Sequence, residues 1–420
     1  MNIITNLNKL ILSPVMFSVL FICGAVLLIR LRGFPFTSPI KVLKGLKNGD
    51  MLSSFKAMTL ALAGTLGVGN IVGVATAIHM GGAGAVFWML VSALVAMVIK
   101  YAEIYLAVLY RKNGRGGAAY YIRDGLGKPI LAALFSILCI IASFTVGNMI
   151  QVNAVALSFE SEFALNPFIT GVMIALLSFL VIYKGVESIS AFTLRMIPLL
   201  SIGFIIVSIW VIAANRTLVP SVIKQIFTEA FKADSAAGGI IGFFTSNAVR
   251  YGVMRGIGSN EAGCGTAPTA HVTAKTDRPE KQALWGIFEV FVDTVLLCTL
   301  TALVILIYPD NILKYDGMVL AIKAYEGYFG EAAGYILAIS IFFFALSTVI
   351  CWSYYAVESI HYFTKKEIYK KAYIVVYCGF CIIGSVSSLE AVWELSDITI
   401  ALMTIINCYT LISLKNRIKC

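Results

Sequence analysis

The stretch GTLGVGNIVG at residues 64–73 lies inside a long apolar run, and it decides the fold. It places four glycines, Gly64, Gly67, Gly69 and Gly73, beside a threonine and an asparagine. Glycine inside a helix costs roughly 0.5–1 kcal/mol relative to alanine. Such a cluster is typical of an interrupted helix, although close packing between helices would also use small residues.

The composition around this stretch indicates a membrane protein. Of 420 residues, 59% are hydrophobic and 13% are charged, whereas soluble proteins average about 25% charged residues. Apolar runs such as 14–29, 333–357 and 391–414 approach or exceed the ~20 residues that a helix needs to cross a bilayer. The sequence therefore predicts an all-α, multi-pass protein embedded in the lipid bilayer.

Eleven apolar runs have a length suitable for transmembrane helices. They cover residues 14–31, 57–79, 84–110, 130–158, 167–183, 190–213, 238–257, 283–308, 333–362, 372–386 and 391–414. The loops that join them are short, so we expect one transmembrane domain over residues 1–420.

Lys and Arg residues predict the orientation of these spans, because cytoplasmic loops are enriched in both. If the N-terminus lies outside, the inner loops carry 22 basic residues and the outer loops carry 6. We therefore expect the N-terminus outside and the C-terminus inside, in the cytoplasmic (inner) membrane. This topology also accounts for the net charge of +10, so no nucleic-acid partner is needed to explain it.

The motifs of common enzymes are missing from the sequence. The three histidines are far apart, and no metal-binding spacing, nucleophile elbow or phosphate-binding loop occurs. We expect no catalytic residues and no organic cofactor. A channel is also disfavoured, because no repeated filter motif is visible.

Polar residues within the apolar runs are functional candidates, because they are costly at membrane depth. The fourth, seventh and ninth runs contain such residues: Asn148, Gln151 and Asn153; Thr245, Ser246, Asn247 and Arg250; and Ser347, Thr348, Trp352 and Ser353. Isolated hydroxyl groups often bond to their own helix. The amides of Gln151 and Asn247 are stronger candidates, because each needs several partners that lipid cannot supply.

A second interruption is expected in the run 238–257, which also contains glycines and polar residues. The two interrupted runs are five helices apart, so each would open a five-helix half. An odd repeat length forces two halves to insert with opposite topology, as in inverted-repeat secondary transporters. We predict repeats at 57–213 and 238–414, preceded by one extra helix at 14–31.

Six motifs in order resemble the alanine or glycine:cation symporter family, the sodium:alanine symporters. They are AGTLGVGNIVGVATAI (63–78), GGAGAVFWMLVSALVA (81–96), KYAEIYLAVLYR (100–111), RGIGSNEAGCGTAP (255–268), DTVLLCTLTALVIL (293–306) and STVICWSYYA (347–356). The chain departs from the family pattern at Val68, Leu90 and Ala96, where threonine, tryptophan and glycine are usual.

The resemblance implies a ten-helix inverted-repeat core, like that of neurotransmitter-type sodium symporters, and sodium-coupled symport of a small neutral amino acid. By carry-over, the substrate carboxylate would lie at Gly67, Val68 and Gly69. Gln151 and the stretch Thr245, Ser246 and Asn247 would line the pocket, and Thr348 and Trp352 would close it. A proton-coupled or uncoupled carrier of the same fold is the alternative, and the particular amino acid and the oligomeric state stay open.

The resemblance also implies a Na⁺ site, made of carbonyl groups around Gly64 and Gly67 with the hydroxyl groups of Ser347 and Thr348. Four carboxylates lie at or near the ends or in the interiors of the predicted spans: Glu103, Glu289, Asp293 and Asp397. They are interpreted as helix-packing or gate ion pairs, with Lys100 or Arg195 as partners, in preference to a direct ion-binding role. The segment 259–279 is expected to form a packed inner gate next to the sixth helix of the core.

Overall fold

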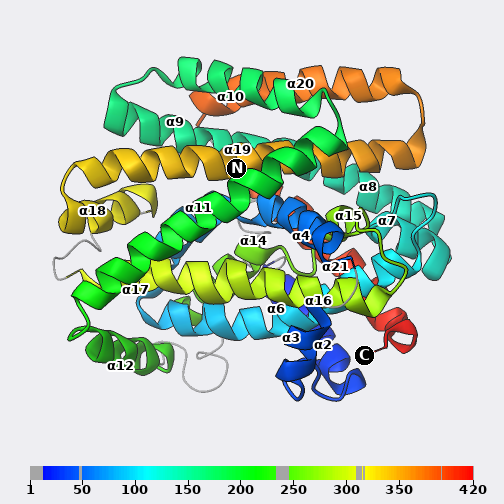
Figure 1. Cartoon of the computed structure of the whole chain (residues 1–420), viewed down its shortest axis with the longest axis horizontal. Coiled ribbons are helices and arrows are strands. Elements are labelled where there is room, and N and C mark those ends of the chain that lie inside the picture. The colour runs from blue at the N-terminus through cyan, green and yellow to red at the C-terminus, as the bar shows by residue number, and fades with distance from the viewer. Residues whose placement is uncertain are drawn as a thin grey trace.

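The computed structural model describes residues 13–46, 50–232, 246–308, 315, 317–388 and 390–419, and over these ranges the chain folds into helices without a β-strand (Figure 1). Helices coincide with all eleven expected runs, although the described part of the seventh begins only at residue 246. The main helices are α2 (Ser13–Arg30), α4 (Met51–Thr65), α5 (Val72–Gly81), α6 (Gly84–Leu109), α8 (Pro129–Phe144), α9 (Ile150–Phe163), α10 (Pro167–Ile182), α11 (Val186–Ala214), α14 (Asn247–Asn260), α16 (Pro279–Val290), α17 (Thr299–Ile307), α19 (Ala332–Phe363), α20 (Glu367–Val386) and α21 (Glu390–Ser413).

Shorter helices lie between these elements. They are α3 (Pro39–Leu46), α7 (Ala118–Tyr120), α12 (Val219–Ala230), α15 (Pro268–His271) and α18 (Gly317–Phe329), with a final 3₁₀ turn, η7, at Lys415–Arg417. In Figure 1, α10 and α20 lie side by side at one edge of the bundle, and α6, α16 and α17 lie toward the other. Long α19 crosses the middle.

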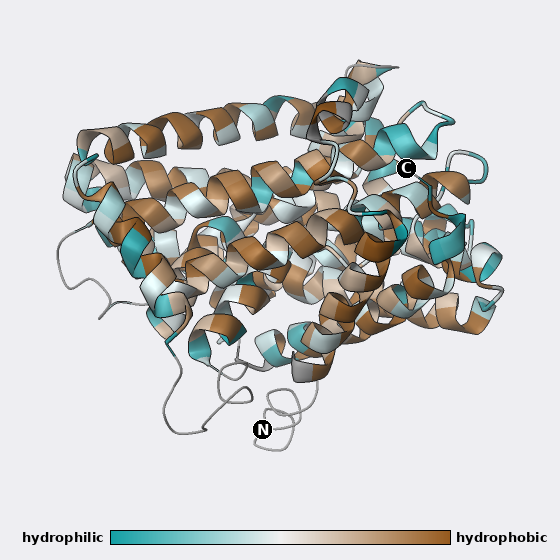
Figure 2. Cartoon of the chain, turned by 90° about the horizontal axis from the view of Figure 1, so that it is seen from below, coloured by the Kyte–Doolittle hydropathy of each residue, from teal (hydrophilic) through white to brown (hydrophobic). Residues whose placement is uncertain are grey.

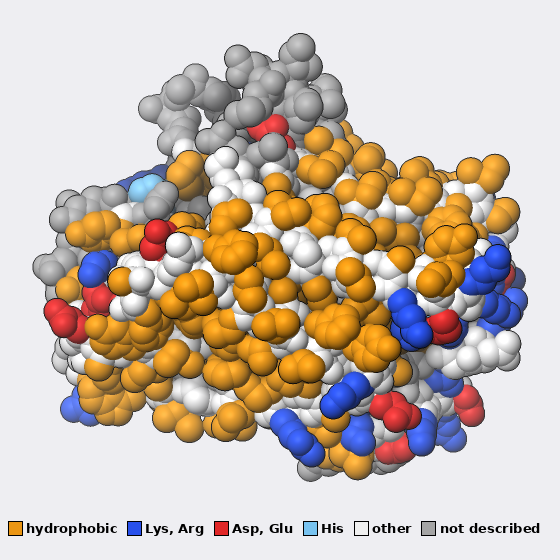
Figure 3. All heavy atoms as spheres, turned by 90° about the horizontal axis from the view of Figure 1, so that it is seen from above, with side chains coloured by type: hydrophobic (Ala, Val, Ile, Leu, Met, Phe, Trp, Pro, Cys, Tyr) orange, Lys and Arg blue, Asp and Glu red, His pale blue; other side chains and the backbone are white. Residues whose placement is uncertain are grey.

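Seven helical stretches in the described ranges are long and apolar enough to cross a membrane, and the bent pair α4–α5 makes eight if it counts as one span. Hydrophobic residues predominate along the helices, and hydrophilic residues are fewer (Figure 2). Hydrophobic side chains cover the middle of the face in Figure 3, while many charged ones gather toward its right-hand end. Leu199, Ile202 and Ile206 of α11 are exposed. A broad apolar belt of this kind is suited to contact with lipid.

The glycine cluster breaks the second apolar run, as its sequence predicts. Helix α4 ends at Thr65, a short turn η2 (Val68–Asn70) follows, and α5 begins at Val72. The two halves are bent by 69°. A β-carbon on Gly67 would lie 2.8 Å from both Gln151 Oε1 and Thr348 Oγ1. The glycine is therefore required by close approach of α9 and α19 to the irregular backbone.

The second interruption was predicted in the run 238–257, of which the structure describes only the second part. Residues 238–245 fall outside the described ranges, but 247–257 belong to the continuous helix α14. The glycines of that helix serve packing instead: β-carbons on Gly252 and Gly256 would lie 2.3 Å from Ala85 O and 2.2 Å from Ser92 Oγ of α6.

The chain leaves the helical path after α14, between Glu261 and Ala267. Glu261 has a left-handed backbone with φ of 53°, and Gly263 and Gly265 have φ of 89° and 76°. Left-handed residues of this kind end helices. Short α15 follows, so the irregular backbone of this region comes after α14 rather than within it.

Two helices contain π-helical turns, in which the backbone winds more widely than in an α-helix. The turn η4 (Thr145–Met149) joins α8 to α9, and η5 (Phe291–Cys298) joins α16 to α17. A further π-helical turn, η3 (Tyr121–Gly125), follows α7. The first two matter for the site, because Gln151 follows η4 directly and Asp293 lies within η5.

The segment that follows α14 is packed, in agreement with the expectation for 259–279. Arg111, after the end of α6, donates hydrogen bonds to the carbonyl oxygens of Val272, Ala274 and Thr276 at 3.1, 2.6 and 2.6 Å. The backbone N–H of Lys275 donates to Ser53 Oγ at the start of α4, at 2.7 Å. This segment is thus fixed to α4 and α6 at one end of the bundle.

Candidate functional site

A cavity of about 440 Å³ opens at the break between α4 and α5. Its walls come from the broken helix, from α9, from the second half of α14, from the segment after α14 and from α21. Gly64, Gly67, Val68, Gly69 and Gln151 are all on its surface. Five of the residues assigned to the substrate or ion site are therefore brought together.

Gln151 fixes the irregular backbone at the centre of this cavity. Its Oε1 accepts a hydrogen bond from the backbone N–H of Val68 at 3.1 Å, and its Nε2 donates to Val146 O at 3.2 Å. Gln151 therefore bonds the irregular backbone of the broken helix. Because Val68 contributes its backbone N–H, this contact is independent of the missing threonine side chain.

Ser347 and Thr348 lie on α19 behind the break, and neither lines the cavity. Both hydroxyl groups donate to the carbonyl oxygen of Phe344, at 2.7 and 3.1 Å. Thr348 Oγ1 is close to Gly67, whereas Gly64 approaches the side chains of Tyr355 and Cys351. Thr348 Oγ1 thus lies close to the backbone of Gly67, and each threonine or serine oxygen retains an acceptor lone pair.

Trp352 is fully buried and does not line the cavity. Its indole Nε1 donates to Glu261 Oε1 at 3.0 Å, and its ring packs against Gly147, where a β-carbon would lie 2.4 Å away. Glu261 itself is on the cavity surface. In this structure Trp352 supports the cavity wall from behind rather than capping the cavity.

The stretch 245–247 lies away from the cavity as far as the structure describes it. Thr245 is outside the described residues. Ser246 caps α14 by accepting from the N–H of Val249 at 3.4 Å, and the carbonyl oxygen of Asn247 lies beside Gly81. The opposite end of α14 lines the cavity, through Gly258, Ser259 and their neighbours.

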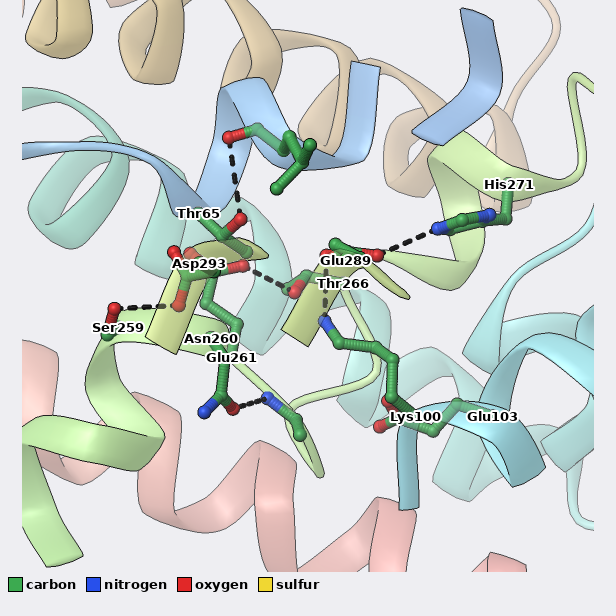
Figure 4. A network of polar contacts seen from close by, with 12 residues as sticks. Thr65, Lys100, Glu103, Ser259, Asn260, Glu261, Thr266, His271, Glu289 and Asp293 are labelled. Carbon is green, nitrogen blue, oxygen red and sulfur yellow. Dashed lines mark hydrogen bonds and ion pairs between the residues drawn. The ribbon is translucent and has the colours of Figure 1, made fainter. Parts of the chain in front are cut away.

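A buried polar cluster beside η2 was missed as a site by sequence reasoning. Asn70 Nδ2 donates to Asp293 Oδ1 at 2.8 Å, and Ser259 Oγ donates to Asp293 Oδ2 at 2.7 Å. Thr294 donates to Asp293 Oδ2 as well, at 2.7 Å. Figure 4 shows Ser259 pointing toward Asp293. Asp293 is a buried carboxylate that is surrounded by neutral donors and oxygen atoms next to the broken helix.

Lys100 of α6 forms a second buried network with α15 and α16 (Figure 4). Its Nζ lies 3.2 Å from Glu289 Oε1, and His271 Nε2 lies 2.8 Å from Glu289 Oε2. Gln282 Nε2 is 2.8 Å from the other ring nitrogen of His271. The expected pairing of Glu289 with Lys100 is confirmed, and the network ties α15 to α6 and α16.

Glu103 was expected to form an ion pair, but its carboxylate accepts hydrogen bonds from neutral groups. Its Oε1 accepts from the backbone N–H of Gly265 at 3.0 Å and from Asn407 Nδ2. Glu103 thus holds the irregular segment after α14 against α6 and α21.

The other two residues of the expected ion pairs lie elsewhere: Asp397 is on the cavity surface, and Arg195 is exposed on α11.

Replacing Gln151 with leucine is expected to weaken substrate binding by about ten- to a hundredfold. The side-chain amide that would contact the bound substrate is lost, and a hydrogen bond to a charged group is worth about 1.5–3 kcal/mol. Substrate affinity of the purified protein measures the effect. Gln225→Leu on exposed α12, where the amide donates a hydrogen bond to Glu229, is the control. Equal affinity of Gln151→Leu and the wild type would contradict a role in the site.

A cavity at a broken membrane helix, lined by backbone, amide and carboxylate groups, defines the class of secondary transporters. The whole chain supports this class, because residues 1–419 match the model of the sodium:alanine symporter family. The chain belongs to this family.

Relatives of the chain extend over nearly its full length. The sodium/alanine symporter AgcS of Methanococcus maripaludis is 35% identical over 99% of this chain and 94% of its own. An uncharacterized transporter of Bacillus subtilis, YflA, is 33% identical over 99% and 91%. A Bacillus subtilis protein named as a probable sodium/glutamine symporter, GlnT, is 34% identical over 95% and 85%.

Solved structures share the fold at low sequence identity. A Na⁺-coupled sialic acid symporter, in a substrate-bound outward-open state, has a TM-score of 0.61 and 16% identity, with 94% of this chain and 85% of that chain covered. A manganese transporter of Eremococcus coleocola has a TM-score of 0.56 and 15% identity, with 86% and 76% covered. These likenesses support the all-helical transporter fold.

Proposed function

We propose that the protein carries a small neutral amino acid, of the alanine or glycine class, across the cytoplasmic membrane together with Na⁺. The observation that carries this proposal is the cavity at the α4–α5 break, where exposed backbone and the Gln151 amide meet inside a chain of the sodium:alanine symporter family. Transport would occur by alternating access of this cavity to the two sides of the membrane.

The substrate carboxylate would bind at the irregular backbone of Gly67, Val68 and Gly69. Backbone N–H groups at the start of a half-helix favour an anionic group. Gln151 Oε1 accepts a hydrogen bond from the Val68 N–H. Binding would exchange this hydrogen bond for one to the carboxylate, and the freed amide would then contact the substrate. Exchange of one partner for another leaves no buried donor without a bond.

The proposed ion site lies on the other side of the break, between α4 and α19. Carbonyl groups around Gly64 and Gly67 and the hydroxyl oxygens of Ser347 and Thr348 would coordinate Na⁺. The proximity of Thr348 Oγ1 to Gly67 supports this assignment. Hydroxyl and carbonyl oxygens are suitable ligands for a hard cation, and half-helix ends with unwound carbonyls coordinate Na⁺ in transporters.

The proposed topology follows the repeat boundaries 57–213 and 238–414, with 14–31 as an extra helix and the N-terminus outside. The break at 66–67 and the irregular segment after α14 would be corresponding positions of the two repeats. This correspondence places the second interruption at residues 261–267, where three residues have left-handed backbone conformations.

Proton coupling is the second candidate, and the buried carboxylate of Asp293 favours it. Asp293 lies beside the broken helix with Asn70 and Ser259 as donors. A carboxylate in such a place could carry a proton between the two sides of the membrane.

Uptake into proteoliposomes tests the function directly. Radiolabelled alanine and glycine are offered with an inward Na⁺ gradient, with an inward proton gradient, or with neither. The proposal expects accumulation only with the Na⁺ gradient. Accumulation driven by the proton gradient alone would favour the second candidate, and the absence of uptake of either amino acid would reject symport of this substrate class.

Replacing Thr348 with valine is expected to raise the Na⁺ concentration that gives half-maximal uptake. The change keeps the shape of the side chain and removes one proposed oxygen ligand. Because Na⁺ and substrate affinities must be linked equally in both directions, substrate affinity should largely recover at saturating Na⁺.

The control is Thr301→Val on α17, a buried threonine whose hydroxyl also donates to the carbonyl four residues earlier. It should leave the Na⁺ dependence unchanged. If Thr348→Val transports with the wild-type Na⁺ dependence, or is equally impaired at every Na⁺ concentration, Thr348 is not an ion ligand.

A further inference from the structure

The α-ammonium group of an amino-acid substrate needs its own partner in the cavity. The broken helix offers backbone N–H groups to the carboxylate, but the ammonium group carries a positive charge and three further N–H donors. A cation taken out of water requires an anion or several acceptors around it. Because the carboxylate and the ammonium are bonded to the same carbon atom, this partner must lie in the part of the cavity that contains the Gly67–Gly69 backbone.

Glu261 is a carboxylate on the surface of this cavity. It follows the end of α14, where its left-handed backbone, with φ of 53°, turns the chain out of the helix. This conformation is unfavourable for a residue with a β-carbon. It persists where the surrounding structure enforces it, and such positions are common at ligand sites.

Contacts of α14 with η2 bring Glu261 to the broken helix. Ser259 Cα lies 3.8 Å from the β-carbon position of Gly69. Asn70 Nδ2 donates to Ser259 Oγ at 3.0 Å. Glu261 is only two residues further along the chain, so its backbone starts beside the irregular turn.

Contacts with α19 place the carboxylate on the same side. Glu261 Oε1 accepts from Trp352 Nε1 at 3.0 Å. Trp352 is one helical turn, about 6 Å, beyond Thr348, and Thr348 Oγ1 lies 2.8 Å from the β-carbon position of Gly67. The carboxylate is therefore held between α14 and α19, next to the break.

The protein supplies Glu261 with neutral hydrogen-bond donors instead of a counter-charge. The residue is buried, and no lysine, arginine or histidine nitrogen of the described ranges lies within 4.0 Å of its carboxylate. Lys100 pairs with Glu289. Besides Trp352 at Oε1, Thr266 donates to Oε2 at 2.7 Å. About two of the four acceptor positions of the carboxylate are thus left for a ligand.

We propose that Glu261 binds the α-ammonium group of the substrate and thereby selects amino acids over other small carboxylic acids. This inference rests on the proposed amino-acid symport and adds the residue that recognises the positive charge. Lactate has nearly the size and shape of alanine, but a hydroxyl group replaces the ammonium. Its carboxylate would enter the cavity beside that of Glu261 without a compensating cation, so lactate should bind poorly.

Competition for uptake of radiolabelled alanine into proteoliposomes at saturating Na⁺ tests the proposal. Unlabelled alanine and lactate are offered to the wild type and to Glu261→Gln, which keeps the shape of the side chain and can still bond Trp352 and Thr266. With the wild type, alanine should compete at least about a hundredfold better than lactate. In Glu261→Gln, the apparent affinity for alanine should fall about ten- to a hundredfold, as expected for loss of a hydrogen bond between charged groups. The apparent affinity for lactate should stay the same or rise.

Glu103→Gln is the matched control. Glu103 is also a buried carboxylate that accepts from neutral groups, but it does not line the cavity. Its replacement should leave the ratio of the alanine and lactate affinities unchanged, even where it lowers the melting temperature. A purely structural role of Glu261 would weaken alanine and lactate together, so this ratio separates recognition of the ammonium group from loss of packing.

Three results would overturn the assignment. If the wild type transports alanine but Glu261→Gln keeps the wild-type ratio, the ammonium group binds elsewhere and the proposed symport stands. If Glu261→Gln only raises the Na⁺ requirement, and alanine affinity is normal at saturating Na⁺, Glu261 acts on the ion instead. If the wild type transports no amino acid under any gradient, the proposed function fails and the assignment fails with it.

Discussion

Lys100→Met is expected to destabilise the folded protein by about 3–5 kcal/mol, because it leaves a buried carboxylate without its counter-charge. Lys100 and Glu289 are almost completely buried, and Nζ lies 3.2 Å from Oε1. His271 contacts the other carboxylate oxygen, so the loss would also loosen α15. Thermal unfolding of the purified protein in detergent measures the change as a lower midpoint temperature.

The double variant Lys100→Met with Glu289→Gln should recover much of this stability, since removal of both charges avoids the unpaired one. Lys323→Met is the control, because Lys323 forms an ion pair with Glu326 while its own side chain is partly exposed. Such pairs contribute about 0–1 kcal/mol. A single variant that melts with the wild type, or a double variant no better than the single one, would contradict a stabilising pair.

Gly67→Ala is expected to reduce transport at least about thirtyfold, because the added methyl group would clash with neighbouring side chains. Its backbone is extended, with φ of −122°, so alanine is allowed there by its conformation. The new β-carbon, however, would lie 2.8 Å from both Gln151 Oε1 and Thr348 Oγ1. Displacement of these atoms breaks the bond to Val68 and overpacks the break, at a combined cost of about 2 kcal/mol or more.

Initial uptake rates in proteoliposomes of equal protein content measure this effect. The control is Gly203→Ala on α11, where the added carbon meets no atom within 4 Å. It should transport like the wild type. Wild-type uptake by Gly67→Ala would show that the contacts of Gln151 and Thr348 at the break do not matter for transport.

The helices and the first break could be predicted from the sequence, because both depend on local properties. Apolar length sets where a chain can cross a bilayer, and all eleven runs coincide with helices over the described residues. The cluster at 64–73 combines four glycines within ten residues. One of them, Gly67, faces side chains from two other helices.

The role of the glycines in the described part of the run 238–257 could not be predicted from the sequence, because glycine has two uses in membrane helices: it interrupts them, or it lets another helix approach. In α14, Gly252 and Gly256 allow α6 to approach, and this depends on a neighbour that is 160 or more residues away in the chain. The irregular segment after α14 contains Glu261, whose left-handed conformation no local rule would predict for a glutamate.

The candidate site was predicted only in part, because some of its residues are brought together from distant parts of the sequence. Gln151 was found because an amide at membrane depth is conspicuous on its own. Arg255 and Asp397 meet at the cavity from helices that are distant in sequence, and Asp293 gains its significance only from Asn70 and Ser259 around it. Trp352 was assigned to a cap, but its indole bonds Glu261 in the wall. Such convergence depends on tertiary packing.

The number of residues in the π-helical turn η4 decides which side chains of this region face their partners. Each α-helical residue turns the backbone by about 100°, and a π turn accommodates one residue more than an α turn. Deletion of one residue within Thr145–Met149 would restore regular α-helical winding and change the angle between the side chains inside the turn and those that follow it. Gln151 and the Asn148 that bonds α20 could then no longer both face their partners. Chains that conserve this transport site should accordingly tolerate insertions and deletions in the surrounding loops but keep this stretch at constant length.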